Sequence, residues 1–494
     1  MLNLSKKFPR YSVEITALLA GLLLPFSFAP YELFWLQFPL LAYLFFICLQ
    51  QTPKVTFLRA FLFSFGYFAH GIHWIYYSLH YHGGAPVFLA VVIIFLLAIY
   101  LSLFPALALY LSNKLFKNNK TMIQLLVYAT SWMLFDWLRG YFLTGFPWLQ
   151  LGVAHVDTWL SGYASLMGGL GVGFIVTIIA AALAYAVIEK RPLYILVTVA
   201  VCYLAGYLLQ QINWTQPVGE PIKVSLVQGN IPQAEKWRRD MYAPTLQMYR
   251  QLTQKHMESD LIIWPETAIP GYKYRVTDYL DNLALEAEKN NTEVLLGLFV
   301  RDIQKQRYYN SLIDLNGQEY QKRHLVPLGE YFPLRSLLSI VEQWIHIPMS
   351  DLDSGEKNQP LIKVAGHPVG ISICFEDAFD REVLTDLPEA RLLINVSNDA
   401  WFEDSPQPWQ HHQIARMRAI ETGRTMLRVT NTGVSSVIDN KGHVLAISEQ
   451  FKRQVLTHHV QAHQGATPYV IWGNALLVLS GLVALIFIYR KISK

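Results

Sequence analysis

The sequence predicts two kinds of structure in one chain: a multi-pass α-helical membrane domain of about eight transmembrane helices, and an α/β domain of layered sheets and helices. Two observations predict this. Of the 494 residues, 53% are hydrophobic and only 15% are charged, whereas about a quarter of the residues are charged in an ordinary soluble protein. The hydrophobic excess is gathered in long apolar stretches, and the rest of the chain alternates short β-branched runs with polar stretches.

Eight apolar stretches predict the membrane domain, since roughly 20 helical residues cross a bilayer. They lie near residues 12–29, 33–50, 58–78, 87–112, 121–138, 160–188, 193–211 and 469–489. The first is similar to a cleavable signal sequence, but Ser27-Phe-Ala29-Pro30 is a poor cleavage site and a second apolar stretch follows at once. We therefore expect a seven-helix domain over 1–214, a polar domain over 215–466, and an eighth helix with a short tail over 467–494.

The lysine and arginine residues between these stretches predict the orientation. They precede the first stretch and follow the second, fourth, sixth and eighth, whereas the intervening short loops carry only Arg139. Because cytoplasmic loops keep positive charge, we expect both termini in the cytoplasm and the polar domain on the far side. The net charge of +4 comes largely from these loops, so it indicates no nucleic-acid partner.

The polar region from Ile222 to about Gln461 predicts an α/β fold. Expected strands are Ile222–Gln228, Leu261–Trp264, Val294–Phe299, Ser311–Asp314, Val369–Cys374, Leu392–Val396, Met426–Thr430 and Val434–Asp439, and expected helices are 238–258, 275–290 and 409–423. Such alternation favours sheets covered by helices. The pattern leaves open whether one sheet or two are present.

Three residues of the polar region have the chemistry of acyl transfer. Cys374 and Glu266 end two of the strand-like runs, and Lys322 follows a third. The other cysteines, Cys48 and Cys202, lie in apolar stretches, so the polar region can form no disulfide within itself. If the three side chains meet at one sheet edge, the carboxylate can deprotonate the thiol and the ammonium can hold a negative oxygen.

Three sequence blocks around these residues resemble the signature blocks of the nitrilase (carbon–nitrogen hydrolase) superfamily. They are Trp264-Pro-Glu-Thr-Ala, Lys322-Arg-His-Leu-Val-Pro-Leu-Gly-Glu330 and Cys374-Phe-Glu376. Members of this superfamily use a Glu-Lys-Cys triad on an αββα sandwich. The membrane half, with Trp137-Leu-Arg-Gly-Tyr and Thr144-Gly-Phe-Pro-Trp-Leu, together with Ser397-Asn-Asp-Ala-Trp-Phe and Pro408-Trp-Gln-His, makes the whole chain similar to apolipoprotein N-acyltransferases.

The resemblance implies an enzyme of the bacterial inner membrane, with its catalytic domain on the periplasmic side. It would move an acyl chain from a membrane glycerophospholipid to the N-terminal amine of a diacylglyceryl-cysteine apolipoprotein. The implied route is ping-pong, through a thioester on Cys374. No cofactor and no metal are implied. We expect a monomer, because nothing in the sequence indicates otherwise.

The same resemblance assigns roles to individual residues. Glu266 would be the base, and Lys322 would stabilise the oxyanion together with the backbone N–H of Phe375, because fixed donors act where charge develops. The family often has tyrosine at the position of Phe375, which puts a hydrogen-bonding side chain there in doubt. Glu330 and Glu376 resemble two supporting carboxylates. If the strand continued past Cys374, Glu376 would point to the same face as the thiol.

Aromatic residues supply the expected substrate contacts. Trp237, in Asn230-Ile-Pro-Gln-Ala-Glu-Lys-Trp, resembles a substrate-contacting tryptophan of the family, and we also assign Tyr331 and Trp401 to substrate binding. Rings favour the membrane interface, so the segments that begin at Gly271, Tyr331 and Trp344 are expected to dip toward lipid, with a lid as the preferred interpretation. Ordinary hydrophobic cover over the sheet is the alternative for these segments, and core packing is the alternative for Trp237.

Several of these residues also have a simpler structural interpretation. From spacing alone, Glu266 can be a helix cap and Lys322 a solvated surface lysine. The adjacent His411 and His412 invite a metal site, but no cysteine or acid stands at ligand spacing. Asp136 and Arg139, three apart on one helix, are expected to pair.

Two other functions compete with acyl transfer. A membrane-tethered amidase would use the helices only as an anchor, for which eight are far more than needed. A transporter would require ionisable residues deep in the membrane, and the apolar stretches have almost none.

Overall fold

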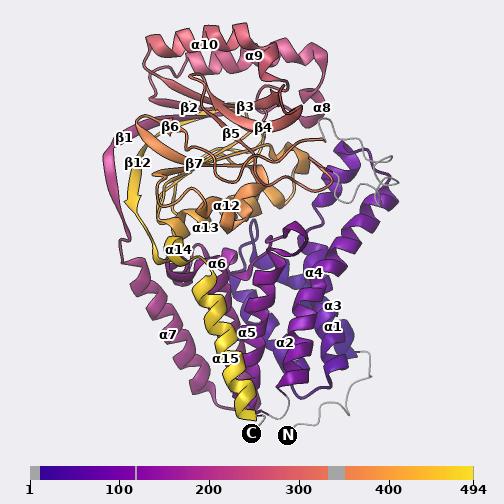
Figure 1. Ribbon diagram of the computed structural model, residues 1–494. Helices are drawn as coiled ribbons and strands as arrows, with labels where there is room; N and C mark the ends of the chain where they lie inside the picture. The colour runs from indigo at the N-terminus through magenta and orange to yellow at the C-terminus, as the bar shows by residue number, and fades with distance from the viewer. Residues whose placement is uncertain (1–11, 117–118, 332–350, 493–494) are drawn as a thin grey trace. The chain divides into compact units, whose positions relative to one another are not determined.

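The computed structural model describes residues 12–116, 119–331 and 351–492, and it divides into two compact units (Figure 1). The helical unit takes in Met1–Ile75, Phe88–Ile212 and Ile471–Lys494, and the α/β unit takes in Tyr76–Val87 and Asn213–Val470. The short segment Tyr76–Val87 therefore groups with the α/β unit, although the sequence placed it in the third apolar stretch and the loop that follows. It contains the π-helix η4 (Tyr77–His82).

Helices cover each of the apolar stretches seen in the sequence. They are α1 (Ser12–Leu23), α2 (Gln37–Cys48), α3 (Pro53–Gly71), α4 (Val87–Leu115), α5 (Thr121–Arg139), α6 (Ala164–Glu189), α7 (Pro192–Gln210) and α15 (Ala475–Ile492), joined in part by short 3-10 turns. The third helix starts earlier than expected because the hydroxyl of Thr52 accepts the N–H of Val55 and caps it at Pro53. It also ends earlier, at Gly71.

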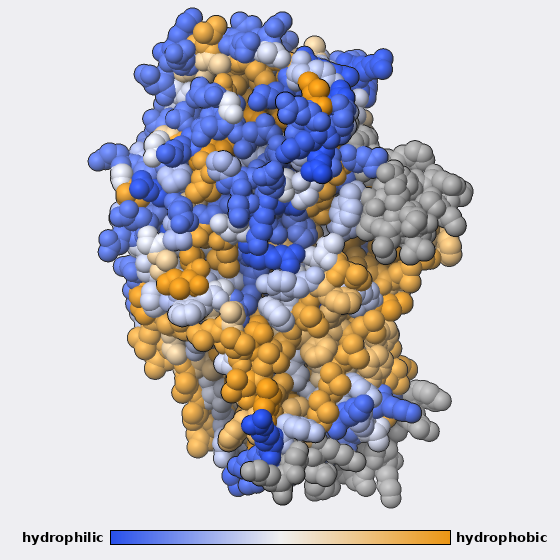
Figure 2. Space-filling view, viewed as in Figure 1, coloured by the Kyte–Doolittle hydropathy of each residue, from blue (hydrophilic) through white to orange (hydrophobic). Residues whose placement is uncertain are grey.

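The surface of the helical unit is predominantly hydrophobic, whereas that of the α/β unit is predominantly hydrophilic (Figure 2). Within the described residues, the segments Val87–Leu115, Trp159–Glu189 and Pro192–Gln210 have the length and the apolar composition to cross a membrane. Ser12–Ser27 and Phe34–Cys48 are apolar but shorter. By this measure the structure supports three crossing helices, and the count of eight stays a prediction.

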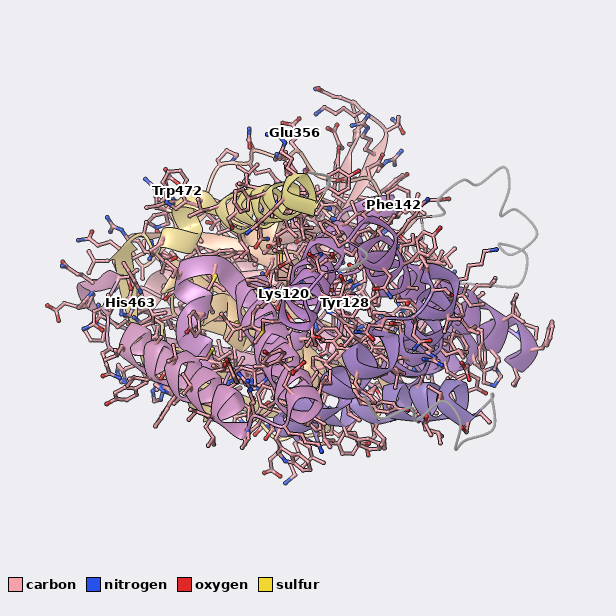
Figure 3. The ribbon with its side chains drawn as sticks, turned by 90° about the horizontal axis from the view of Figure 1, so that it is seen from below. Lys120, Tyr128, Phe142, Glu356, His463 and Trp472 are labelled. Atoms are coloured by element: carbon pink, nitrogen blue, oxygen red, sulfur yellow. The ribbon has the colours of Figure 1, made fainter. Side chains whose placement is uncertain are left out.

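Small residues and buried polar groups join the helices to one another. A Cβ atom on Gly21 of α1 would lie 1.8 Å from the carbonyl oxygen of Phe63 on α3, so only glycine allows this close contact. Asp136 and Arg139 form the ion pair that their spacing predicts. Tyr128 lies among the helices (Figure 3), where its hydroxyl donates to the carbonyl of Cys48.

The α/β unit contains two six-stranded sheets, which answers the question that the sequence left open. The first has the order β12-β1-β2-β3-β4-β5, with β1 (Thr215–Gln228), β2 (Leu261–Ile263), β3 (Glu293–Asp302), β4 (Arg307–Asp314), β5 (Glu319–Gln321) and β12 (Gln454–Gly465). The second has the order β11-β10-β9-β8-β7-β6, with β6 (Lys363–Val364), β7 (His367–Ile373), β8 (Leu392–Ser397), β9 (Met426–Thr430), β10 (Ser436–Ile438) and β11 (Val444–Ile447).

Helices cover the outer face of each sheet, which gives an αββα sandwich (Figure 1). The helices α9 (Arg239–Gln254) and α10 (Thr277–Lys289) pack on the first sheet, and α12 (Asp380–Leu384) and α13 (Gln407–Thr422) pack on the second. Among the described residues, the remaining α-helices are the short α8 (Gln233–Lys236) and α14 (Pro468–Trp472). Between the sheets lies an apolar core that includes Leu226, Ile371 and Ile394. This core fixes the facing sheets against each other, since buried apolar area stabilises their contact.

Parallel pairing positions the functional residues. In the first sheet β1, β2 and β3 are parallel, and in the second β7, β8 and β9 are parallel. Parallel strands end at the same edge of a sheet, so the residues that follow them are brought together. The polar strand β12, which the sequence analysis missed, pairs antiparallel with β1 along most of its length, with an irregularity between Val218 and Ile222.

Candidate active site

The three residues expected to form a triad lie just beyond the ends of three strands. Glu266 follows β2, Lys322 follows β5, and Cys374 follows β7. Oε1 of Glu266 is 3.5 Å from Nζ of Lys322, and the Cys374 thiol interacts electrostatically with both groups. The structure therefore brings the carboxylate, the ammonium and the thiol into one site between the two sheets.

Lys322 is a buried cation held by carboxylates. Only 1% of its side chain is exposed, and its Nζ lies 2.9 Å from Glu330 in addition to its contact with Glu266. Burial disfavours its charge, but Glu330 and Glu266 outweigh burial and raise the pKa of Lys322 above its ordinary value. Lys322 is thus a permanent positive charge beside the thiol, and the surface-lysine interpretation is wrong.

Glu266 is fixed on both of its oxygens. Oε1 accepts from Nδ2 of Asn310 at 2.8 Å, and Oε2 accepts from the backbone N–H of Asn398 at 2.9 Å. No helix begins directly after Glu266, since the next one starts at Lys273, so the helix-cap interpretation fails. The carboxylate is oriented by neutral donors and lies next to the thiol, which suits a base.

Cys374 is held in a strained turn. It is half-buried, has a positive φ of 55°, and opens the 3-10 helix η9 (Cys374–Ala378). Burial, with the negative charges of Glu266 and Asp399, raises the pKa of its thiol, while the Lys322 ammonium and the Ser397 hydroxyl oppose this. The thiol therefore keeps its proton near neutral pH, and attack on a substrate requires a base that removes it.

Comparison with known proteins places this site in a family. Residues 20–182 match the model of the apolipoprotein N-acyltransferase N-terminal domain, and residues 223–469 match the carbon–nitrogen hydrolase model. The apolipoprotein N-acyltransferase of Methylococcus capsulatus is 42% identical over 97% of this chain and 96% of its own length. Those of Nitrosomonas europaea and Vibrio cholerae are 40% and 36% identical, over 95% and 97% of this chain and 96% and 97% of their own.

The chain belongs to the apolipoprotein N-acyltransferase family. The family resemblance drawn from the sequence blocks is thereby confirmed. The αββα architecture of the α/β unit agrees with the match of residues 223–469 to the carbon–nitrogen hydrolase model.

The two supporting carboxylates of this family member have different surroundings. Glu330 contacts Lys322 directly, because its Oε1 accepts from Nζ of Lys322 at 2.9 Å and from Nδ2 of Asn310 at 3.1 Å. Glu376 does not share a strand face with Cys374, because β7 ends at Ile373. The expectation based on strand alternation is therefore wrong.

Glu376 instead links the turn at Cys374 to the segment that contains Lys322. It is fully buried and accepts the backbone N–H groups of Ile373, Arg323 and His324, at 2.6, 2.6 and 2.9 Å. The hydroxyl of Tyr320 donates to it at 3.0 Å. Burial raises the pKa of Glu376 to about 7. Its position indicates that it fixes Cys374 relative to Lys322.

The aromatic residues assigned to substrate binding do not form one group. Trp237 and Tyr331 pack with the apolar cluster of Phe299, Leu325 and Leu352. Trp401, on η10 (Asp399–Phe402), packs edge-on against His82 of η4, with ring centroids 5.8 Å apart. The expected lid segment that begins at Trp344, and the one that begins at Tyr331 except for Tyr331 itself, lie outside the described residues.

The side chains of Phe375 and Trp237 each pack against another aromatic ring. The Phe375 ring packs edge-on against Phe379 at 4.9 Å, in keeping with a packing role at this position. The Trp237 ring stacks on Phe299 at 6.0 Å, so core packing accounts for part of its environment. Its indole N–H is buried without a hydrogen-bond partner among the described residues, which leaves a donor for a bound molecule.

Several polar residues of the site escaped the sequence analysis. Asn310, on β4, bridges Glu266 and Glu330. Lys236, at the end of α8, is buried and donates to the carbonyl of Glu266 at 3.3 Å; burial lowers the pKa of Lys236 to about 8. Lys236 lies within the block quoted for Trp237, but no role was attached to it, and no motif pointed to Asn310.

A second set of residues that the sequence analysis missed lies next to Cys374. His411 contacts the carbonyl of Cys374 at 3.2 Å and lies 2.7 Å from Asp377 and 3.3 Å from Asp399. The Ser397-Asn-Asp and Pro408-Trp-Gln-His blocks contain two of these residues, so the signal was present but had no role attached. In the part of the chain that the structure describes, no cluster of histidine, cysteine and acidic residues is arranged to hold a metal.

Proposed function

We propose that this protein transfers an acyl chain from a membrane glycerophospholipid to the N-terminal amine of diacylglyceryl-cysteine apolipoproteins, through a thioester on Cys374. The observation that carries the proposal is the match of both parts of the chain to apolipoprotein N-acyltransferases over nearly their full length. The buried carboxylate, ammonium and thiol support it, because this is the equipment that acyl transfer needs.

In the first half-reaction, Glu266 takes the thiol proton as the sulfur of Cys374 attacks the ester carbonyl carbon of the phospholipid. The carbon–sulfur bond forms, and the carbonyl oxygen becomes an oxyanion beside the Lys322 ammonium. The ester carbon–oxygen bond then breaks, and Glu266 returns the proton to the departing alkoxide. The products are a thioester on Cys374 and a lysophospholipid.

In the second half-reaction, the neutral amine of the lipoprotein attacks the thioester carbonyl carbon. Glu266 takes a proton from the amine nitrogen, the oxyanion again faces Lys322, and the carbon–sulfur bond breaks. The thiolate regains its proton from Glu266. We propose that Glu330 and Glu376 hold Lys322 and Cys374 in position. We also propose that the backbone N–H of Phe375 donates a hydrogen bond to the oxyanion.

The setting of the reaction is part of the proposal. We place the enzyme in the bacterial inner membrane, with its α/β unit on the periplasmic side, both termini in the cytoplasm and up to eight crossing helices. The distribution of lysine and arginine supports this orientation. Trp237, Tyr331 and Trp401 are proposed substrate contacts, and the enzyme is proposed to act as a monomer, without a cofactor.

The test combines the purified full-length protein with phosphatidylethanolamine vesicles and a synthetic diacylglyceryl-cysteine peptide that has a free N-terminus. We expect the peptide to gain one acyl chain and an equal amount of lysophospholipid to appear. The matched control is the same peptide with an acetylated N-terminus, which should gain nothing. Release of ammonia from small amides, with no acylated peptide, would instead support the tethered amidase.

A further inference from the structure

Ser397 lies beside the nucleophile in the second sheet. It is the last residue of β8, which pairs in parallel with β7 so that Val396 is opposite Ile373. Ser397 is therefore level with Cys374 at the edge where the strands end. Its side chain is fully buried, its hydroxyl lies 2.8 Å from Oδ1 of Asp399, and it lowers the pKa of the neighbouring Cys374 thiol.

Asp399 is a permanent anion next to this hydroxyl. Burial alone would raise the pKa of its carboxyl, but Arg428 and His411 overcome burial and lower it to about 2. Nη2 of Arg428 is 2.9 Å from Oδ2, and Nδ1 of His411 is 3.3 Å from Oδ1. An ionised carboxylate only accepts hydrogen bonds, so Ser397 is the donor in its bond to Asp399 while the thiol carries its own proton.

The hydroxyl of Ser397 has one proton and two acceptors to choose between. When the sulfur is a thiol, its S–H can donate to Oγ of Ser397 while the hydroxyl donates to Asp399. When the sulfur is a thiolate, the hydroxyl can turn and donate to it. Asp399 keeps Arg428 and His411 in that state, so the turn leaves no buried charge without a partner.

We infer that Ser397 is a catalytic residue that stabilises the Cys374 thiolate by moving its hydrogen bond from Asp399 to the sulfur. Negative charge develops on the sulfur twice in the reaction: as the thiol loses its proton and attacks the donor ester, and when the amine expels sulfur from the thioester. Ser397 would therefore accelerate both half-reactions. This inference rests on the proposed function. It deepens that function by adding a hydrogen-bond donor to the sulfur, besides the donors to the oxyanion.

His411 is a positioning residue for Cys374 and for the carboxylate of Asp399. Its Nε2 and Nδ2 of Asn395 both approach the carbonyl oxygen of Cys374, at 3.2 and 3.1 Å. Burial disfavours charge on His411, but Asp377 and Asp399 raise its pKa above the ordinary value. A charged imidazole can donate from Nδ1 to Asp399 and from Nε2 to Asp377, which lies 2.7 Å away, with the Cys374 carbonyl next to the same Nε2. It thereby couples the strained turn at Cys374 to the carboxylate that orients Ser397.

The test compares Ser397→Ala with Ser436→Ala in the full-length protein. Ser436, on β10 of the same sheet, also has a buried hydroxyl, but it has no hydrogen-bond partner among the described residues. The first readout is the rate at which iodoacetamide alkylates Cys374 as a function of pH, followed on the Cys374 peptide by mass spectrometry. No lipid is needed, so this readout is independent of acyl transfer.

We expect Ser397→Ala to slow alkylation at neutral pH about tenfold, because a hydrogen bond to a charged group is worth at least about 1.4 kcal/mol. The profile should move to higher pH, and that of Ser436→Ala should not. An unchanged profile in a folded Ser397→Ala protein would overturn the inference. Ser397→Thr separates packing from donation: it should react faster than Ser397→Ala if the hydroxyl matters, and slower if only the space matters.

The second readout is acyl-enzyme formation from phosphatidylethanolamine vesicles and its discharge to the lipoprotein peptide. Both rates should fall about tenfold in Ser397→Ala, in line with the alkylation rate. If the wild type forms no acyl-enzyme but the alkylation profile of Ser397→Ala still moves, the proposed function fails and the role of Ser397 stands. If acyl transfer occurs and Ser397→Ala equals the wild type in both readouts, the role of Ser397 fails alone.

Discussion

The helical unit and the α/β unit each bury a polar cluster, and the two clusters differ in charge. In the helical unit, Nδ2 of Asn113 donates to the carbonyl of Cys48, and its Oδ1 accepts from Gln124 at 2.9 Å and from Tyr128. All of these groups are neutral. Around Cys374, by contrast, the cluster is made of ionisable groups: Glu266, Lys322, Asp399 and Arg428 are buried, and Glu330 is partly buried.

The difference indicates what each cluster is for. Neutral hydrogen bonds join helices at small cost, and they contribute about 1 kcal/mol each. Burying a charge costs far more unless it is paired, and replacing a buried pair with apolar residues is often neutral or stabilising. A dense set of buried charges is therefore poor evidence for stability. In the α/β unit the charges gather around one thiol, which supports a chemical role.

The largest expected effect separates chemistry from structure. Replacing Glu266 with glutamine removes the proposed base while keeping the shape of the side chain. We expect acyl-enzyme formation to slow by about 10²–10⁴-fold, the usual contribution of a general base. The matched control is Glu319→Gln, a partly buried carboxylate on β5 outside the triad. Equal rates in Glu266→Gln and the control would remove Glu266 from the mechanism.

Replacing either of two lysines of the site should change the free energy of unfolding by very different amounts. Lys322→Met leaves Glu266 and Glu330 close together without a cation, so we expect a loss of about 3–5 kcal/mol in the free energy of unfolding. Lys236 forms no ion pair among the described residues, so Lys236→Met should change that free energy by less than about 1 kcal/mol. Thermal unfolding in detergent measures both. A larger loss in Lys236→Met would contradict this contrast.

The pH dependence of stability should reveal Glu376. Its folded-state pKa of about 7 lies above the ordinary value of 4.5, so the folded state holds this proton more tightly than the unfolded state. Its contribution is therefore fully present below pH 4.5 and is lost as the pH rises through about 7. Relative to Glu376→Gln, the wild type should lose about 3 kcal/mol across this window. A constant difference in Tm from pH 4 to pH 8 would rule out the raised pKa.

The smallest expected effect concerns the helical cluster. Asn113→Ala removes the oxygen that accepts from Gln124 and Tyr128 and the amide that donates to the Cys48 carbonyl, and we expect the protein to lose about 1–3 kcal/mol of stability. Alkylation of Cys374 should be unchanged. Ser64→Ala, which removes a buried hydroxyl without a partner among the described residues, is the control. The contrast between the two clusters breaks down if Asn113→Ala alters Cys374 reactivity instead of stability.

Local patterns were enough to predict much of the fold. The apolar stretches predicted helices, the alternation of runs predicted layered sheets, and the motif blocks predicted the meeting of Glu266, Lys322 and Cys374. The polar strand β12 was missed because its residues, such as His458 and His459, show no apolar alternation; its pairing with β1 decides its conformation. Propensity is overridden here by long-range hydrogen bonds.

The details of the site depended on contacts that sequence spacing does not contain. Glu376 was misplaced because β7 ends one residue before Cys374, whose positive φ turns the chain away from the strand direction. Ser397 and His411 approach Cys374 only because β8 is parallel to β7 and α13 packs on their sheet. Such proximity follows from the assembled sheet, so only the structure could show it.

The most direct test of the central claim is the intact mass of the protein after incubation with phospholipid alone. Wild type and Cys374→Ala are compared, with no lipoprotein peptide present. The account predicts that the wild type gains the mass of one acyl chain, that hydroxylamine removes it as expected for a thioester, and that Cys374→Ala gains nothing. A wild type of unchanged mass, or an equal gain in both proteins, would contradict an acyl-enzyme on Cys374.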